Sequence, residues 1–181
     1  DYRWSAAIGG MLGLAVVGAS DMGEIDRTAR KLKNKLGDDE AWFFTWQELG
    51  DELKQKADDC RNRGHTISAS VFYLRASCYY QWGERFRTVK DDHALNVYRK
   101  SVECFHEHAQ LSISPKIEIV EVPYEGNFLP GYFVHAENTK KPINPTMIFF
   151  DGLDITKELQ YARGVPELIK RGFSCLVMDG P

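Results

Sequence analysis

Long apolar runs are scarce in this sequence, and none is long enough to cross a membrane. The most apolar stretch, residues 6–19, is short and is interrupted by glycine. We interpret it as a buried helix or a dimer contact, in which Gly9, Gly10 and Gly13 permit close approach. A signal-peptide core is the alternative, but only Arg3 precedes the stretch and the chain has no initiator methionine. We therefore expect a homodimer and no membrane partner.

Basic clusters and paired cysteines are also missing. The net charge is −3 and no basic stripe occurs, so nucleic acid is not an expected partner. The 4 cysteines form no C-x-x-C pair, which favours buried thiols in a reduced, cytoplasmic protein. Glu103, His106 and His108 are explained better by a solvated helix face than by metal binding, and we expect neither a metal nor a cofactor. With 43% apolar and 27% charged residues, the chain can form a packed core.

Residues 1–114 are patterned as helices. Asp21 and Glu24 have the spacing of a capping box, in which each side chain bonds a backbone N–H of the first turn. The helix that they begin is expected to reach Leu36 and to stop at Gly37. Apolar residues three and four apart predict three further helices. These run from Asp38 or Asp39 to Arg63 (with Trp42, Trp46, Leu49 and Leu53 on one face), from the cap Thr66 through Tyr80, and from Asp91 and Asp92 through Ala109.

Residues 115–181 have a period of two and predict strands near 117–122, 129–136, 146–150 and 174–179. The first pair is expected to be an antiparallel hairpin, with its turn at 124–127. The last two are apolar runs, typical of parallel strands buried on both faces, and a helical stretch broken at Pro166 joins them. The class is therefore α/β. Because this sheet has no helix for its second face, we expect the chain to be part of a larger molecule.

The segment after the third predicted strand carries the most informative residues. Ligands bind at the carboxyl ends of parallel strands in open α/β sheets, and Gly152, Leu153 and Asp154 follow such an end directly. Gly152 suits a tight turn. A plain strand-to-helix turn capped by Asp154 or Thr156 explains the residues equally well. Lys157 and the neighbouring Glu158 are expected to pair and to brace this loop.

Several stretches in order along the chain resemble one α/β-hydrolase family. It includes bacterial 2,6-dihydroxypseudooxynicotine hydrolase and the fungal hydrolases that shorten polyketides in conidial pigment and melanin synthesis. The fermentation-respiration switch protein is a more distant relative. The similar stretches are Asp151–Glu158 (DGLDITKE), Arg171–Pro181 (RGFSCLVMDGP), Gly18–Glu24, the helix of Trp42 and Trp46, Ser70–Tyr80 and Pro123–Gly131.

The resemblance implies a helical cap or lid domain at 1–114. Residues 115–181 would then form the first strands and helix of the hydrolase domain. It implies that the loop after the third strand supplies an oxyanion-hole N–H, from Leu153 or from Asp154, with Gly152 setting the geometry. No G-x-S-x-G string occurs in the sequence, so the catalytic triad is expected outside this chain. The missing C-terminal part would be either continuous with this chain or a second chain packed against it.

The resemblance also implies a serine-type hydrolase that cleaves a C–C bond next to a carbonyl in an aromatic or polyketide-type substrate. An ester, lactone or peptide hydrolase would present the same loop, and a non-catalytic relative is the third alternative. A cap over such a site needs aromatic surface, for which Tyr73, Tyr80 and Trp82 are the candidates. The alternative for these three side chains is the core of the helices.

Overall fold

The computed structural model describes residues 1–137, 143–150, 152 and 155–181. The chain divides into two compact units, residues 1–108 and 109–181. The sequence predicted a boundary between Ser114 and Pro115, whereas the last predicted helix continues to Leu111 and its end is grouped with the second unit.

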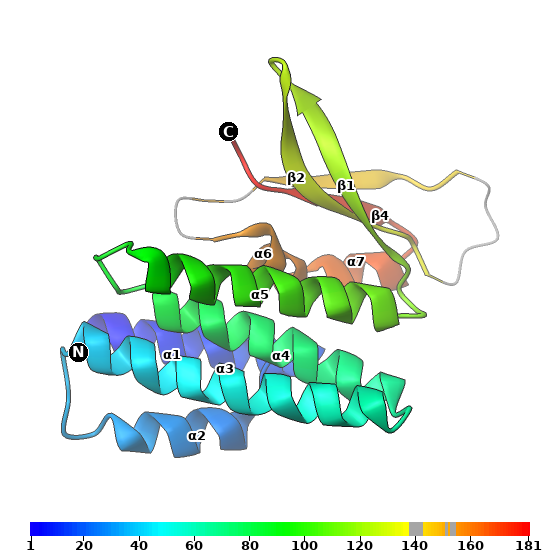
Figure 1. The fold of residues 1–181 in the computed structure, drawn as a ribbon. Coiled ribbons are helices and arrows are strands. Elements are labelled where there is room, and N and C mark those ends of the chain that lie inside the picture. Colours follow the sequence, from blue (N-terminus) through cyan, green and yellow to red (C-terminus); the bar gives the residue numbers. More distant parts are fainter. Residues whose placement is uncertain (138–142, 151, 153–154) are drawn as a thin grey trace. The chain divides into compact units, whose positions relative to one another are not determined.

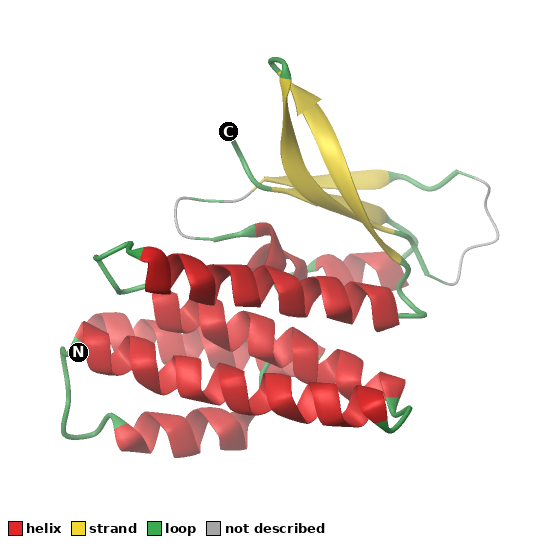
Figure 2. Cartoon of the chain, viewed as in Figure 1, coloured by secondary structure: helices red, strands yellow, loops and turns green. Residues whose placement is uncertain are grey.

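The first unit is entirely helical (Figures 1 and 2). The helices at residues 39–62 and 66–84 pack along one another, and Trp42, Trp46, Leu49 and Leu53 of the first of them are all buried, as predicted. Within the described residues, no helix combines the length and the apolar character that a membrane span requires. The elements are α1 (Tyr2–Leu14), the 3-10 turn η1 (Ala15–Val17), α2 (Met22–Lys31), α3 (Asp39–Asn62), α4 (Thr66–Glu84) and α5 (Asp92–Leu111).

Glycine lets aromatic rings lie directly on neighbouring helices. A Cβ atom on Gly50 would come within 2.6 Å of the Tyr80 ring, and one on Gly10 within 2.7 Å of the Trp82 ring. Among the three glycines of α1, only Gly10 therefore accommodates a close neighbour within the described residues, and that neighbour is a side chain. The predicted buried helix contact is therefore present at Gly10, Cβ atoms on Gly9 and Gly13 would meet no atom within 4 Å, and the dimer contact stays a prediction.

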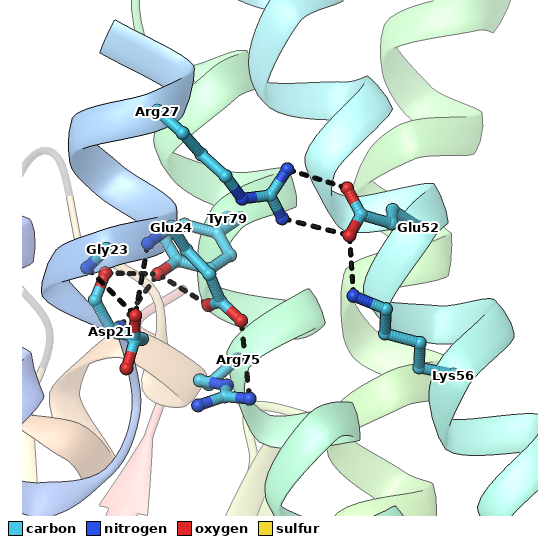
Figure 3. A network of polar contacts seen from close by, with 8 residues as sticks. All are labelled: Asp21, Gly23, Glu24, Arg27, Glu52, Lys56, Arg75 and Tyr79. Atoms are coloured by element: carbon cyan, nitrogen blue, oxygen red, sulfur yellow. Dashed lines mark hydrogen bonds and ion pairs between the residues drawn. The ribbon is translucent and has the colours of Figure 1, made fainter.

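Helix α2 is capped only half as the sequence predicted (Figure 3). The Asp21 carboxylate accepts from the N–H groups of Gly23 and Glu24, at 2.9 and 3.0 Å, which confirms the first half of the capping box. The Asp21 N–H, however, donates to the Tyr79 hydroxyl at 2.9 Å. Glu24 points to α4 instead, where it accepts from Tyr79 at 3.1 Å and pairs with Arg75 at 3.3 Å. A side chain from α4 thus replaces the reciprocal cap.

Two helix ends differ from the prediction. Helix α2 ends at Lys31, because Leu32 N–H bonds carbonyls of the preceding turn and successive tight turns then lead to Gly37. Across the gap to α3, Arg27 forms a double hydrogen bond with Glu52 at 2.9 Å, and Figure 3 shows this bridge. Helix α4 starts at Thr66, with His65 as the capping position and no side-chain cap bond. Thr66 is therefore the first residue of the helix and not its cap.

The second unit contains one four-stranded sheet of order β1-β2-β4-β3. Strands β1 and β2 are antiparallel and β3 and β4 are parallel, both as predicted. The hairpin turns at Glu125 and Gly126, whose φ angles of 45° and 80° suit a tight two-residue turn. The strands are β1 (Ile117–Tyr124), β2 (Asn127–Val134), β3 (Thr146–Phe150) and β4 (Ser174–Met178).

Strand β3 is not buried on both faces, and the prediction is wrong on this point. Met147, Ile148 and Phe150 expose 41%, 52% and 66% of their surface. Among the strands described in this chain, β3 pairs with β4 alone, whereas β4 lies between β2 and β3 and is almost wholly buried. An apolar run predicted the strand correctly but could not show its place in the order.

Two short helices connect β3 to β4. They are α6 (Lys157–Ala162) and α7 (Val165–Lys170), and Pro166 lies in the first turn of α7, where its missing N–H costs nothing. The predicted break at this proline is confirmed. Gly172 follows with a φ of 86°, a conformation that favours glycine, and the chain then enters β4.

Candidate active-site edge

The parallel strands bring the predicted loop and the end of β4 to one edge of the sheet. Phe150 lies opposite Met178 in the register, so β3 and β4 end at the same edge of the sheet. Gly152 is exposed, and its carbonyl accepts from the Ile155 N–H at 3.3 Å. Asp179 follows β4 directly. The edge is the one at which α/β sheets bind ligands.

Asp179 holds the beginning of α6. One carboxylate oxygen accepts from the backbone N–H of Lys157 at 2.8 Å, and the other accepts from the Lys157 ammonium at 2.5 Å. Thr156 is the capping position of α6 but makes no side-chain cap bond. The carboxylate that caps this helix therefore comes from another element. Asp179 is itself fixed, because its N–H donates to the carbonyl of Pro130 in β2 at 3.2 Å.

A second carboxylate completes this group of contacts. Glu158 is fully buried, accepts from the Tyr132 hydroxyl at 2.6 Å and pairs with the Lys157 ammonium at 3.0 Å. The Lys157 ammonium also lies 5.5 Å from the centre of the Tyr132 ring. We call Tyr132, Lys157, Glu158 and Asp179 the strand-end cluster. One ammonium is thus shared by two carboxylates in a buried setting, where electrostatic contacts are strong.

The two carboxylates respond differently to this setting. Burial by itself would raise the pKa of Glu158, but the Lys157 ammonium and the Tyr132 hydroxyl outweigh burial and hold that pKa below its usual value. Burial raises the pKa of Asp179 above its usual value, and its contacts with Lys157 offset that only in part. Glu158 is therefore the firmer counter-ion of Lys157, and Asp179 is the carboxylate that takes up a proton first.

The predicted site residues are only partly described by the structure. Gly152 lies at the carboxyl edge of the parallel strands, but Leu153 and Asp154 lie outside the described residues, so the oxyanion donors stay predictions. The predicted pair of Lys157 and Glu158 is confirmed. Sequence reasoning missed Asp179, although its position directly after a buried strand was a usable signal.

Tyr132 was also missed, and its sequence position carries no such signal. It lies in the middle of β2, opposite Ile119 of β1 and Val177 of β4. Only the packing of α6 on the sheet brings its hydroxyl to Glu158, which lies 26 positions away in the sequence.

The three candidate substrate contacts lie inside the helical unit. Tyr73, Tyr80 and Trp82 are exposed by 3% or less. The Tyr73 hydroxyl donates to Asp58 at 2.5 Å and the Tyr80 hydroxyl donates to Asp51 at 2.7 Å. This arrangement is that of the core alternative, and a substrate contact for these residues stays a prediction.

His108 differs from the solvated position expected of it. It is only 7% exposed, and its Nδ1 lies 2.9 Å from the Ser70 hydroxyl on α4. Within the described residues, no three histidine, cysteine or acidic side chains are grouped as metal ligands. The cysteines are free thiols, and Cys78, Cys104 and Cys175 are buried.

Comparison with known proteins identifies curated relatives that are named as hydrolases. No protein-family model matches the chain. It is 28% identical to the hydrolase acrC of Aspergillus aculeatus and 28% identical to the hydrolyase poxO of Penicillium oxalicum, over 94% of its length in each case. It is 24% identical over its whole length to the alpha/beta hydrolase ucsC of Acremonium sp. The chain spans 43%, 41% and 39% of these three relatives, less than half of each.

The fold has a counterpart among solved structures. The crystal structure of 2,6-dihydroxy-pseudo-oxynicotine hydrolase matches with a TM-score of 0.73 and 23% identity, over 94% of this chain and 45% of that one. The chain thus has the α/β-hydrolase fold over the part that it covers, and the curated proteins that it resembles are named as hydrolases.

Proposed function

We propose that this chain is part of a serine-type hydrolase that cleaves a C–C bond next to a carbonyl in an aromatic or polyketide-type substrate. Hydrolase-named relatives and the fold shared with a hydrolase named for 2,6-dihydroxy-pseudo-oxynicotine support the reaction class. The observation that supports the proposal is the shared carboxyl edge of β3 and β4, where Asp179 after β4 binds the N–H of Lys157, the first residue of α6.

In the proposed reaction, a serine from outside this chain attacks the ketone carbon. The oxyanion is stabilised by the N–H of Leu153 or Asp154, aimed at the charge as it develops. The bond from the carbonyl carbon to the ring or enol carbon breaks, and that carbon takes a proton. Water then hydrolyses the acyl-enzyme to a carboxylic acid and restores the serine. This chain would supply the oxyanion side, and the remaining C-terminal part of the hydrolase would supply the triad.

An ester, lactone or peptide hydrolase is the second candidate, since it would use the same loop with a better leaving group. The test compares two probes on the complete protein. One is a dihydroxyphenyl alkyl ketone, and the other is the phenyl ester of the carboxylic acid that hydrolysis of this ketone would release. We expect a fluorophosphonate to label one serine of the complete protein, and we expect the ketone to be hydrolysed to the carboxylic acid and the dihydroxybenzene. Turnover of the ester alone would favour the second candidate. No labelling and no turnover of either probe would overturn both.

Gly152→Val tests the loop itself. A branched side chain beside the proposed donors restricts the backbone and hinders the substrate oxygen, so kcat should fall at least ~100-fold, as the loss of one oxyanion donor does. Gly164→Val is the matched control, because its added Cβ also meets no described atom within 4 Å and the residue precedes α7, away from the loop. Normal kcat in Gly152→Val would show that the loop is only a connector.

A further inference from the structure

The single carboxylate of Asp179 connects three elements of the second unit. Its backbone N–H binds β2, it directly follows β4, and its two oxygens bind both the N–H and the ammonium of the first residue of α6. Helix α6 is only 6 residues long, which is too short to be stable by itself. Its start is therefore set by what holds Lys157.

We propose that Asp179 is a positioning residue, which fixes the beginning of α6 against the end of β4 and thereby sets the connection from β3 on which the oxyanion donors lie. This inference rests on the proposed function. Asp179 would not contact the substrate. It would act through Lys157, whose N–H and ammonium it holds at 2.8 and 2.5 Å.

The cluster leaves Lys157 little freedom. Its side chain is 4% exposed and its ammonium lies between Asp179 and Glu158, while Tyr132 holds Glu158 from β2. Removing the Asp179 carboxylate leaves the Lys157 N–H without its cap and gives the ammonium one counter-ion fewer. The first turn of α6 should then shift or fray toward Thr156. A displacement of about 1 Å at a catalytic group is enough to lower a rate ~100-fold.

The experiment uses two substitutions in the complete protein, of which the second removes more of the Asp179 interactions than the first. Asp179→Asn keeps an oxygen that can accept from the Lys157 N–H but removes the charge, and Asp179→Ala removes both interactions. We expect kcat to fall by ~3–10-fold in Asp179→Asn and by ~30–100-fold in Asp179→Ala, with KM within ~3-fold of the wild type. Rates are expressed per active site, counted by the endpoint of fluorophosphonate labelling, so that loss of folded protein does not count as loss of kcat.

Hydrogen exchange at the Lys157 amide measures positioning independently of catalysis. It should accelerate in Asp179→Ala and less in Asp179→Asn. Glu167→Gln is the control: this carboxylate lies on α7, is half exposed and pairs with Lys170 and Arg171. It should change neither kcat nor this exchange.

The outcomes separate the two proposals. If the wild-type protein is not labelled by the fluorophosphonate and turns over neither probe, the proposed function fails, whatever the hydrogen exchange at Lys157 shows. If the wild type is active and Asp179→Ala keeps normal kcat per site, Asp179 is a structural residue only and the positioning role is overturned. That role is also overturned if kcat falls while Lys157 exchange is unchanged, because the effect would then not pass through α6.

Discussion

Acidification should destabilise the helical unit through one buried histidine. His108 on α5 packs against Ser70 of α4 and the ring of Phe105, and it is almost fully buried. Burial lowers its pKa to about 4, although the contact with the Ser70 carbonyl opposes this shift. In the unfolded chain the same group has a pKa of about 6.5.

The direction in which the free energy of unfolding changes with pH follows from the number of protons that the folded and the unfolded states bind. Between pH 6.5 and pH 4 the unfolded chain binds a proton at residue 108 and the folded chain does not, so the free energy of unfolding falls as the pH falls. One pKa unit corresponds to about 1.4 kcal/mol, and from pH 7 to pH 5 the loss amounts to about 2 kcal/mol. That is a large share of the stability of a typical domain.

Urea unfolding at pH 7 and pH 5, followed by tryptophan fluorescence, measures this loss. All 4 tryptophans lie in the helical unit, so the signal reports on that unit alone. His108→Gln should reduce the pH-dependent loss by about 2 kcal/mol relative to the wild type. His65→Gln, the same change at an exposed position, should leave the loss unchanged. Equal losses in His108→Gln and the wild type would refute the reasoning.

Two further substitutions test the packing of the helices. Gly50→Ala puts a Cβ within 2.6 Å of the Tyr80 ring, whose hydroxyl is anchored on α3, so the helical unit should lose about 1–3 kcal/mol in urea unfolding despite the better helix propensity of alanine. Tyr79→Phe removes the acceptor of the Asp21 N–H and a donor to Glu24, which should cost about 1–3 kcal/mol and increase amide exchange at the start of α2. Unchanged stability in Gly50→Ala, or unchanged stability and exchange in Tyr79→Phe, would contradict these contacts.

The sequence was sufficient wherever a local rule controls the structure. The period of two predicted the strands, the Glu125–Gly126 turn followed from residue type, and Pro166 marked the start of α7 because proline fits only the first turn of a helix. Local rules failed where a distant residue competes. Glu24 has the spacing of a reciprocal cap, yet Tyr79 takes that role, and nothing near Glu24 in the sequence indicates it.

The same distinction applies to the edge of the sheet. Strand order depends on which strands pair, so the apolar run of β3 could not show that β4, and not β3, lies between two strands of this chain. His108 was assigned to a solvated face together with Glu103 and His106, whereas its ring contacts Ser70 of α4 and Phe105 of α5. Pairing and helix packing are long-range properties, which a single sequence does not encode at one position.

The strand-end cluster shows why half of a site can be predicted and the other half cannot. Lys157 and Glu158 are adjacent in sequence, and their pairing could be anticipated from charge alone. Asp179 becomes the second partner of Lys157 because β3 and β4 are parallel and in register, which brings two carboxyl ends to one edge. A loop that must hold backbone N–H groups in a fixed geometry needs support at both of its ends. The register of β3 and β4 fixes Phe150 before this loop, and the Asp179 carboxylate holds Lys157 after it, which is why we propose the oxyanion donors at this edge.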